Sequence, residues 1–279
     1  MEGQVNILLN LLINFPLPQF CYNQKMNKTP FSLAPEYRDY VWGGSKLRPQ
    51  IVPTAEAWII FAGNRITSGP YAGRALSDLS LEFGVDLLGT KAVTQTGNRF
   101  PVLVKILDCA QWLSLQVHPN DEQAQKLEGE GSFGKTEAWH VLEAEPNVEL
   151  VAGINPNISA EQLTAAIQSK NESILELVEK VKVVAGDTLF MHPGTVHALG
   201  PGMIIYEIQQ TSDITYRVYD WGRPETETRK LHIDKAVAVS NPNAASLPVK
   251  PPQMDDGEVT TLTQCQYFQL DEIRVEKKT

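Results

Sequence analysis

Short apolar segments separated by turn residues recur through the middle of the chain and constrain its fold more than any other feature. Glycine, proline, asparagine and aspartate punctuate these segments, and many short strands with such spacing are typical of a β-sandwich or a β-barrel. We expect strands at 100–107, 111–118, 138–144, 148–154, 181–184, 188–191, 203–210 and 214–219. The sequence therefore predicts a mainly β domain.

A helical insertion interrupts these strands. Between Ser159 and Lys180 the apolar residues recur at helical spacing, which predicts one helix over this stretch. A second small helix is expected at 233–239. The expected strands on either side of Glu145-Pro146-Asn147 are predicted to form a hairpin, because this tripeptide is a strong turn signal.

Charge and cysteine content exclude several classes of protein. The formal net charge of −9 argues against a nucleic-acid partner, since a phosphate backbone requires a basic surface. It leaves room for a small anionic substrate, because a few local arginines and lysines can hold one phosphate. The three cysteines are far apart and show no CxxC spacing, which predicts neither a disulfide framework nor a thiolate site and favours a reducing cytoplasm.

The first 25 residues differ from the rest of the chain. Residues 5–20 are apolar, yet no Lys or Arg appears before Lys25, so the segment does not have the basic start of a secretory signal. Asn10, Asn14 and two prolines interrupt it, which argues against a membrane span and against a membrane partner. We interpret it as an extra leader before an internal start at Met26, with a targeting segment as the alternative.

The strand expected at 111–118 carries the first chemically informative motif. In an alternating strand Gln116 and His118 lie two residues apart, so their side chains point the same way. An amide oxygen and an imidazole in this arrangement can bind one metal ion. Taken alone, the segment fits a strand that ends in a solvated histidine better than a metal site.

The motif Gly134-Lys-Thr-Glu-Ala-Trp139 places Lys135, Glu137 and Trp139 on one face of a strand entry. Glu137 can be a carboxylate ligand. Lys135 can hold an anion or serve as an acid or base, since a lysine in a pocket is a common proton-transfer group. Taken alone, the pair also fits an ordinary surface ion pair.

A third motif follows the turn at Ala185-Gly186-Asp187. The pattern G-D-x5-P-x3-H ends at His197 and resembles the second cupin motif, in which the histidine binds a metal. Gln116, His118, Glu137 and His197 together offer two imidazoles, a carboxylate and an amide. This thiolate-free set predicts one Zn²⁺ per chain, with Mn²⁺, Co²⁺ and Fe²⁺ as alternatives. The polar faces that carry it favour a cupin-type (jelly-roll) β-barrel with a lined mouth.

Other polar residues are assigned by their place on the expected strands. Arg217 and Tyr219 are predicted to share a strand face, from which Arg217 can stabilise negative charge on a sugar. Pairing of Arg217 with a neighbouring aspartate is the alternative. His140, His192 and His232 are expected to be structural.

These motifs together resemble the type I mannose-6-phosphate isomerases, especially the short bacterial form. The resemblance runs from about Phe31 to about Tyr267. The motifs that carry it are Tyr40–Gly44, Glu56–Trp58, Gln116–Asp121, Lys135–Trp139, Gly194–Leu199 and Gln209–Trp221.

The resemblance implies a role for each matching residue. His118, Glu137 and His197 are expected to bind zinc, with Gln116 as the fourth ligand. Arg217 and Lys135 are expected to be catalytic. The residues expected to bind substrate are Glu56, Trp58 and Tyr219, and both Lys135 and Glu56 are candidates for the base.

The implied function is aldose–ketose isomerisation of mannose 6-phosphate and fructose 6-phosphate through a cis-enediol, with zinc as a Lewis acid. This reaction feeds mannose and GDP-mannose metabolism in the cytoplasm. The alternatives are a non-catalytic sugar-binding cupin and a cupin metalloenzyme that acts on another class of substrate, such as an Fe²⁺ oxygenase. The oligomeric state is not predicted.

The resemblance also divides the chain into three parts. Residues 1–25 are the unmatched leader, and residues 26–245 are the catalytic cupin domain with its helical insertion. Residues 246–279 are expected to contain a proline-rich linker and the start of the family's small C-terminal β-domain, in truncated form.

Overall fold

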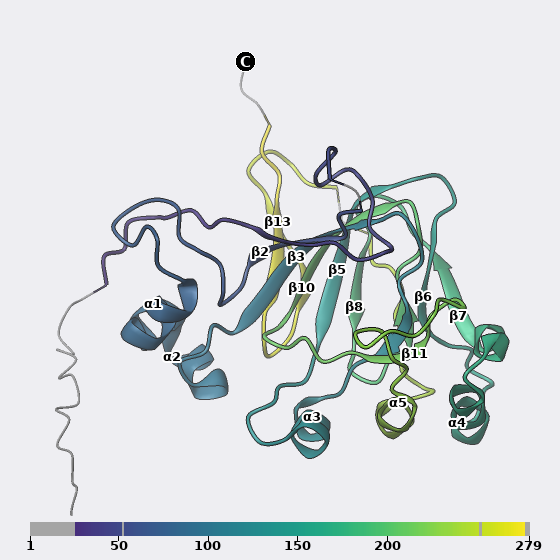
Figure 1. Ribbon diagram of the computed structural model, residues 1–279. Coiled ribbons are helices and arrows are strands. Elements are labelled where there is room, and N and C mark those ends of the chain that lie inside the picture. Colours follow the sequence, from purple (N-terminus) through teal and green to yellow (C-terminus); the bar gives the residue numbers. More distant parts are fainter. Residues whose placement is uncertain (1–25, 52, 251–252, 277–279) are drawn as a thin grey trace, which may run out of the picture.

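The computed structural model describes residues 26–51, 53–250 and 253–276, and the leader predicted at 1–25 lies outside these residues. Two antiparallel sheets dominate the fold (Figure 1). The larger sheet contains, in spatial order, β1 (Glu36–Arg38), β2 (Glu56–Ile60), β3 (Val102–Cys109), β10 (Met203–Gln210), β5 (Glu137–Ala144) and β8 (Thr188–Met191). The smaller sheet contains β11 (Tyr216–Tyr219), β4 (Leu115–Val117), β9 (His197–Ala198), β6 (Glu149–Ile154) and β7 (Val178–Lys182).

The main core lies between the two sheets. Leu107, Trp139 and Ile205 of the larger sheet pack in one cluster with Leu150 and Ala152 of the smaller sheet. All five are almost fully buried, and burial of each large apolar side chain stabilises the fold by about 1.5–3 kcal/mol. The mainly β, cupin-type fold predicted from the strand pattern is confirmed.

Helices cover the outer face of the smaller sheet. Leu163 and Ile167 of α4 (Ala160–Ser169) and Val239 of α5 (Ile233–Val239) pack against Leu115 and Val117 of β4. The remaining helices of the described chain are α1 (Leu76–Phe83), α2 (Val85–Thr96) and α3 (Asp121–Glu128). In Figure 1, α3, α4 and α5 lie along the same side of the molecule.

The single helix predicted at 159–180 is wrong in its second half. The helix begins as expected, with Ser159 accepting a hydrogen bond from the Gln162 amide. It ends at Ser169, because Lys170 adopts a left-handed conformation (φ 56°). A short 3-10 turn (Glu172–Glu176) follows, and the chain is already in β7 at Val178.

The hairpin predicted around Glu145-Pro146-Asn147 is also wrong. β5 lies between β10 and β8, whereas β6 lies between β9 and β7 in the other sheet. The turn, with Asn147 at φ 63°, leads the chain across the core from one sheet to the other. As a result, residues of β5 face residues of β9, and a site can form between the sheets.

The C-terminal strands β12 (Val259–Gln264) and β13 (Gln269–Ile273) form a hairpin against the outer face of the larger sheet. Phe268 anchors it by packing on Val104, Ala138 and Ile208. The division at residue 246 and the truncated second domain stay predictions. Within the described part of the chain, no helix has the length and apolar character to cross a membrane.

Candidate metal centre and active site

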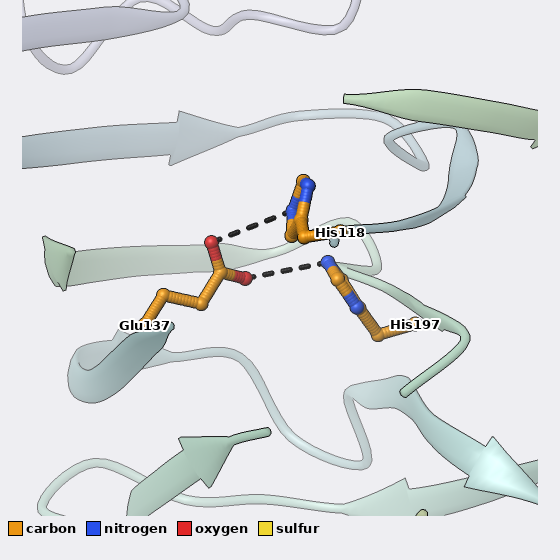
Figure 2. Close-up of side chains that lie close together, drawn as sticks. All are labelled: His118, Glu137 and His197. Carbon is orange, nitrogen blue, oxygen red and sulfur yellow. Dashed lines mark ion pairs between the residues drawn. The ribbon is translucent and has the colours of Figure 1, made fainter. Parts of the chain in front are cut away.

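Three buried side chains converge between the sheets. His118 Nε2 lies 3.5 Å from Glu137 Oε2, and His197 Nε2 lies 3.3 Å from Glu137 Oε1. Figure 2 shows both imidazoles turned toward the carboxylate. One ligand atom from each residue lies within 4.8 Å of the others, which is a spacing that one metal ion can bridge.

The topology explains this convergence. His118 directly follows β4, and His197 opens β9, which pairs with β4. Glu137 opens β5 in the facing sheet and is 0% exposed. The two histidines therefore come from one wall of the core and the carboxylate from the other.

Backbone carbonyls orient both imidazoles. His118 Nδ1 donates to the carbonyl of Ile214, and His197 Nδ1 donates to the carbonyl of Thr195, each at 2.8 Å. Burial lowers the pKa of His118 well below its usual value and lowers that of His197 to about 4. The rings are therefore neutral at physiological pH, with Nε2 available to bind a metal.

The environment of the Glu137 carboxylate tests whether a metal ion fits between these three side chains. Neither of its buried carboxylate oxygens has a hydrogen-bond partner among the described residues. Burial raises its pKa to about 7. A buried carboxylate that accepts no hydrogen bond, although three nitrogen atoms lie within 3.5 Å of it, requires an explanation. Two oriented imidazoles and a carboxylate form a nitrogen and oxygen donor set, which fits a divalent metal ion.

Gln116 borders the space between His118, Glu137 and His197. Its Nε2 lies 3.4 Å from His118 Nε2 and 3.3 Å from His197 Nε2. Rotation of the amide by 180° presents Oε1 to that space instead. The sequence prediction that Gln116 and His118 point the same way agrees with this geometry.

Lys135 is buried against the cluster. Its Nζ lies 3.2 Å from Glu137 Oε2 and 3.3 Å from His118 Nε2. At 4% exposure it is not the surface ion pair that the motif alone also allowed. An amine in this position reaches the space that the three candidate ligand residues face.

Arg217 belongs to a row of residues that crosses the smaller sheet. It lies directly opposite Gln116, which lies directly opposite His197, so the three side chains share the inner face. Arg217 Nη1 donates to the carbonyl of Lys230 at 2.9 Å, and Nε is buried without a partner within the described residues. Burial lowers its pKa, yet the guanidinium stays charged in any protein.

Comparison with known proteins identifies the family. The model for phosphomannose isomerase type I, catalytic domain, matches residues 31–133. Mannose-6-phosphate isomerase ManA of Bacillus subtilis (strain 168) is 37% identical over 260 residues, which cover 88% of this chain and 79% of that protein.

The chain belongs to the type I phosphomannose isomerase family.

Solved structures agree with this family. The crystal structure of the mannose 6-phosphate isomerase from Bacillus subtilis superposes with a TM-score of 0.75 at 32% identity, over 88% of this chain and 79% of that chain. A structure described as mannose 6-phosphate isomerase (holo; zinc bound) gives 0.56 at 19% identity, over 83% and 85% of the two chains. The second comparison supports the fold alone.

Glu56 and Trp58, which the resemblance to this phosphomannose isomerase family singled out, contact each other inside the larger sheet. Trp58 Nε1 donates to Glu56 Oε2 at 2.6 Å. The same oxygen lies 3.6 Å from Lys105 Nζ. Both residues are thus held in a buried polar network, and their part in substrate binding stays a prediction.

The predicted shared face of Arg217 and Tyr219 is wrong. A register shift between them leaves Arg217 opposite Gln116 but places Tyr219 opposite Leu115, on the outer face. Tyr219 packs there against the apolar side chains between the smaller sheet and its helices, and its ring lies edge-on to that of Trp221 with 5.8 Å between the ring centroids. The alternation failed because a β-bulge inserts an extra residue. The predicted substrate contact of Tyr219 stays a prediction.

The sequence reasoning missed Lys105 and Glu207, which are both buried in the larger sheet. Lys105 Nζ lies 3.2 Å from Glu207 Oε1, and Trp139 Nε1 donates to Glu207 Oε2 at 3.0 Å. Trp139 in turn lies edge-on to His197. Burial opposes the charge of Lys105, but Glu56 and Glu207 outweigh it and raise its pKa. The available signal was a charged residue between apolar or aromatic neighbours in each of these two strands.

The remaining described histidines lie outside the ligand cluster, as predicted. His140 Nδ1 contacts Thr188 Oγ1 at 2.9 Å, and His192 is exposed and packs on Phe190. His232 has a more specific contact, since its Nδ1 accepts a hydrogen bond from the backbone amide of Arg217 at 3.1 Å. It therefore supports the strand that carries Arg217.

Proposed function

We propose that this protein interconverts mannose 6-phosphate and fructose 6-phosphate. A proton leaves C2 of the open-chain aldose, a cis-enediol forms, and a proton is added at C1. O2 loses its proton as O1 gains one, so atoms and electrons balance without an external oxidant. The observation that carries the proposal is the buried cluster of His118, Glu137 and His197 with Lys135 against it.

We propose that His118, Glu137 and His197, with Gln116, hold one zinc ion per chain. The donor set of imidazole, carboxylate and amide supports this, and a mannose 6-phosphate isomerase of the same fold has been solved with zinc bound. When bound, zinc supplies Lewis-acid stabilisation of negative charge on the sugar oxygens. Mn²⁺, Co²⁺ and Fe²⁺ suit the same donors.

We assign proton transfer to Lys135. Of the two candidates for the base, Glu56 is engaged by Trp58 and Lys105, whereas Lys135 lies against the ligand cluster itself. A positioned acid–base group is worth about 10²–10⁴-fold in rate.

From the smaller sheet, Arg217 is proposed to orient the substrate and to stabilise negative charge that develops on its oxygens. Its place in the row with Gln116 and His197 supports this, because its fixed fork of donors suits an oxygen anion. Glu56 and Trp58 are proposed to line the opposite wall, where Lys105 holds them in place. These walls would exclude water from the reacting carbons.

The proposed partner is a small sugar phosphate, and the reaction belongs to carbohydrate metabolism. A cytoplasmic site of action is proposed from the cysteine pattern. Cys109 and Cys265 are free thiols, which is consistent with that proposal.

The experiment that tests this function is turnover of mannose 6-phosphate in D₂O by the zinc-loaded full-length protein. We expect fructose 6-phosphate that carries deuterium at C1, with no product from mannose, which lacks the phosphate. Product without deuterium would argue against proton transfer through solvent-exchangeable groups. Binding of the sugar phosphate without turnover would favour the alternative of a sugar-binding cupin.

A further inference from the structure

Asp121, the first residue of α3, collects donors from three distant parts of the chain. Its Oδ1 accepts from the Gly134 amide at 2.7 Å and from Gln210 Nε2 at 2.9 Å. Its Oδ2 accepts from the Tyr267 hydroxyl at 2.6 Å. Hydrogen bonds to a charged acceptor are roughly twice as strong as neutral ones. Asp121 and its three donors, Gly134, Gln210 and Tyr267, therefore form a strongly bonded junction.

The junction joins the segment that carries His118 to the segment that carries Lys135 and Glu137. Asp121 lies three residues after His118, and Gly134 directly precedes Lys135. The Lys135 amide also donates to the carbonyl of Pro119 at 3.0 Å. The backbones touch here, since a Cβ on Gly134 would lie 2.5 Å from the carbonyl carbon of Asn120.

Gln210 extends the junction to the other side of Lys135. Its side-chain Oε1 accepts from the Thr136 amide at 2.8 Å, and its backbone amide donates to the carbonyl of Thr136 at 3.1 Å. The backbone on both sides of Lys135 is therefore fixed through Asp121 and Gln210. Because Gln210 is 4% exposed, water does not readily replace these bonds.

Tyr267 reaches this junction from the turn between β12 and β13. Next to its contact lies a cavity of about 140 Å³, bordered by Phe133, Thr211 and Gln266, so the turn is not close-packed against the rest of the domain there. The hydroxyl is thus a specific link between the hairpin and Asp121. Burial and the Asp121 carboxylate raise the pKa of Tyr267 to about 12, which keeps it a donor.

We propose that Tyr267 is a positioning residue for Lys135. Its hydroxyl holds the Asp121 carboxylate, which fixes the backbone of residues 134–136 and so aligns the Lys135 amine against His118 and Glu137. The C-terminal hairpin thereby contributes to the active site without touching it. The kinetic consequence rests on the function proposed above, whereas the structural consequence does not.

The test compares Tyr267→Phe with Phe268→Leu in the full-length, zinc-loaded protein. Tyr267→Phe removes only the hydroxyl, and we expect kcat to fall about 10-fold because the Lys135 amine is less well aligned, with KM within about twofold and zinc content unchanged. Amide hydrogen exchange of the peptide 129–137 should become faster. Phe268→Leu weakens the packing of the hairpin but keeps the hydroxyl, so it should lower Tm and leave both kcat and this exchange unchanged.

Two variants of Asp121 test the same link from its other end. Asp121→Asn retains an acceptor for Gly134 and Gln210 and can donate to Tyr267, so it should stay within about twofold of the native kcat, whereas Asp121→Ala should lose at least as much as Tyr267→Phe. The proposal is overturned if Tyr267→Phe changes neither kcat nor exchange, or if Phe268→Leu reproduces its effects. If the native protein shows no isomerase activity, the exchange data alone decide: faster exchange at 129–137 only in Tyr267→Phe and Asp121→Ala supports the proposal.

Discussion

The amine of Lys135 lies 3.2 Å from Oε2 of Glu137, and both side chains are almost wholly buried. The proposed proton-transfer group and a metal-ligand candidate therefore share one enclosed space. Because Lys135 is not itself a ligand candidate, its chemistry can be separated from metal binding by substitution.

Lys135→Met should lower kcat by at least about 10²-fold, because a positioned acid–base group is lost. Metal content should stay at the native level. Steady-state kinetics together with metal analysis checks both. Lys46→Met is the matched control, since Lys46 forms an exposed pair with Glu143. Native turnover in Lys135→Met would exclude this residue as the acid–base group.

His118→Ala should remove most of the bound metal and lower turnover by at least about 10²-fold, because one of three converging donors is lost. Metal analysis after dialysis measures the first effect and kinetics the second. His192→Ala, which removes an exposed imidazole outside the cluster, should change neither. An unchanged metal content in His118→Ala would contradict the ligand assignment.

Arg217→Ala should leave the metal in place and lower kcat by about 10²-fold, the usual loss for a group that stabilises developing negative charge. Arg274→Ala is the control, since Arg274 is exposed on the C-terminal hairpin. A rise in KM with native kcat would instead mean that Arg217 binds substrate and transition state equally well.

Lys105→Met should destabilise the fold by about 3–5 kcal/mol, because Glu56 and Glu207 are left as buried charges without their cation. Urea denaturation measures the free energy of unfolding. Adding Glu207→Gln should recover part of the loss by removing one of these charges. Lys235→Met, which breaks an exposed pair with Glu128, should cost less than about 1 kcal/mol. Equal losses in the two lysine variants would contradict the buried network.

Local patterns predicted those parts of the site that depend on one segment at a time. Strand alternation placed Gln116 and His118 on one side, and the turn pattern before His197 marked it as a ligand candidate. Glu137 and Lys135 followed from their shared motif. Side-chain direction within a strand has a period of two residues, so a short sequence is enough to predict it.

The wrong predictions concern features that depend on pairing between strands far apart in the sequence. Nothing in residues 138–154 says that β5 and β6 belong to different sheets, because hydrogen-bond partners far away in the sequence decide this. The bulge that separates Arg217 from Tyr219 has the same origin. Lys105 and Glu207 were missed because each lies between apolar or aromatic neighbours in the sequence, and only the pairing of β3 with β10 shows that they neutralise each other.

Turnover of mannose 6-phosphate by metal-stripped protein, with and without added Zn²⁺, tests the central claim most directly. We expect no fructose 6-phosphate from the stripped protein and restored production when about one equivalent of Zn²⁺ is added, since one cluster of donors is present in the described chain. A folded protein that binds zinc at this cluster and still fails to convert mannose 6-phosphate would contradict the proposed reaction.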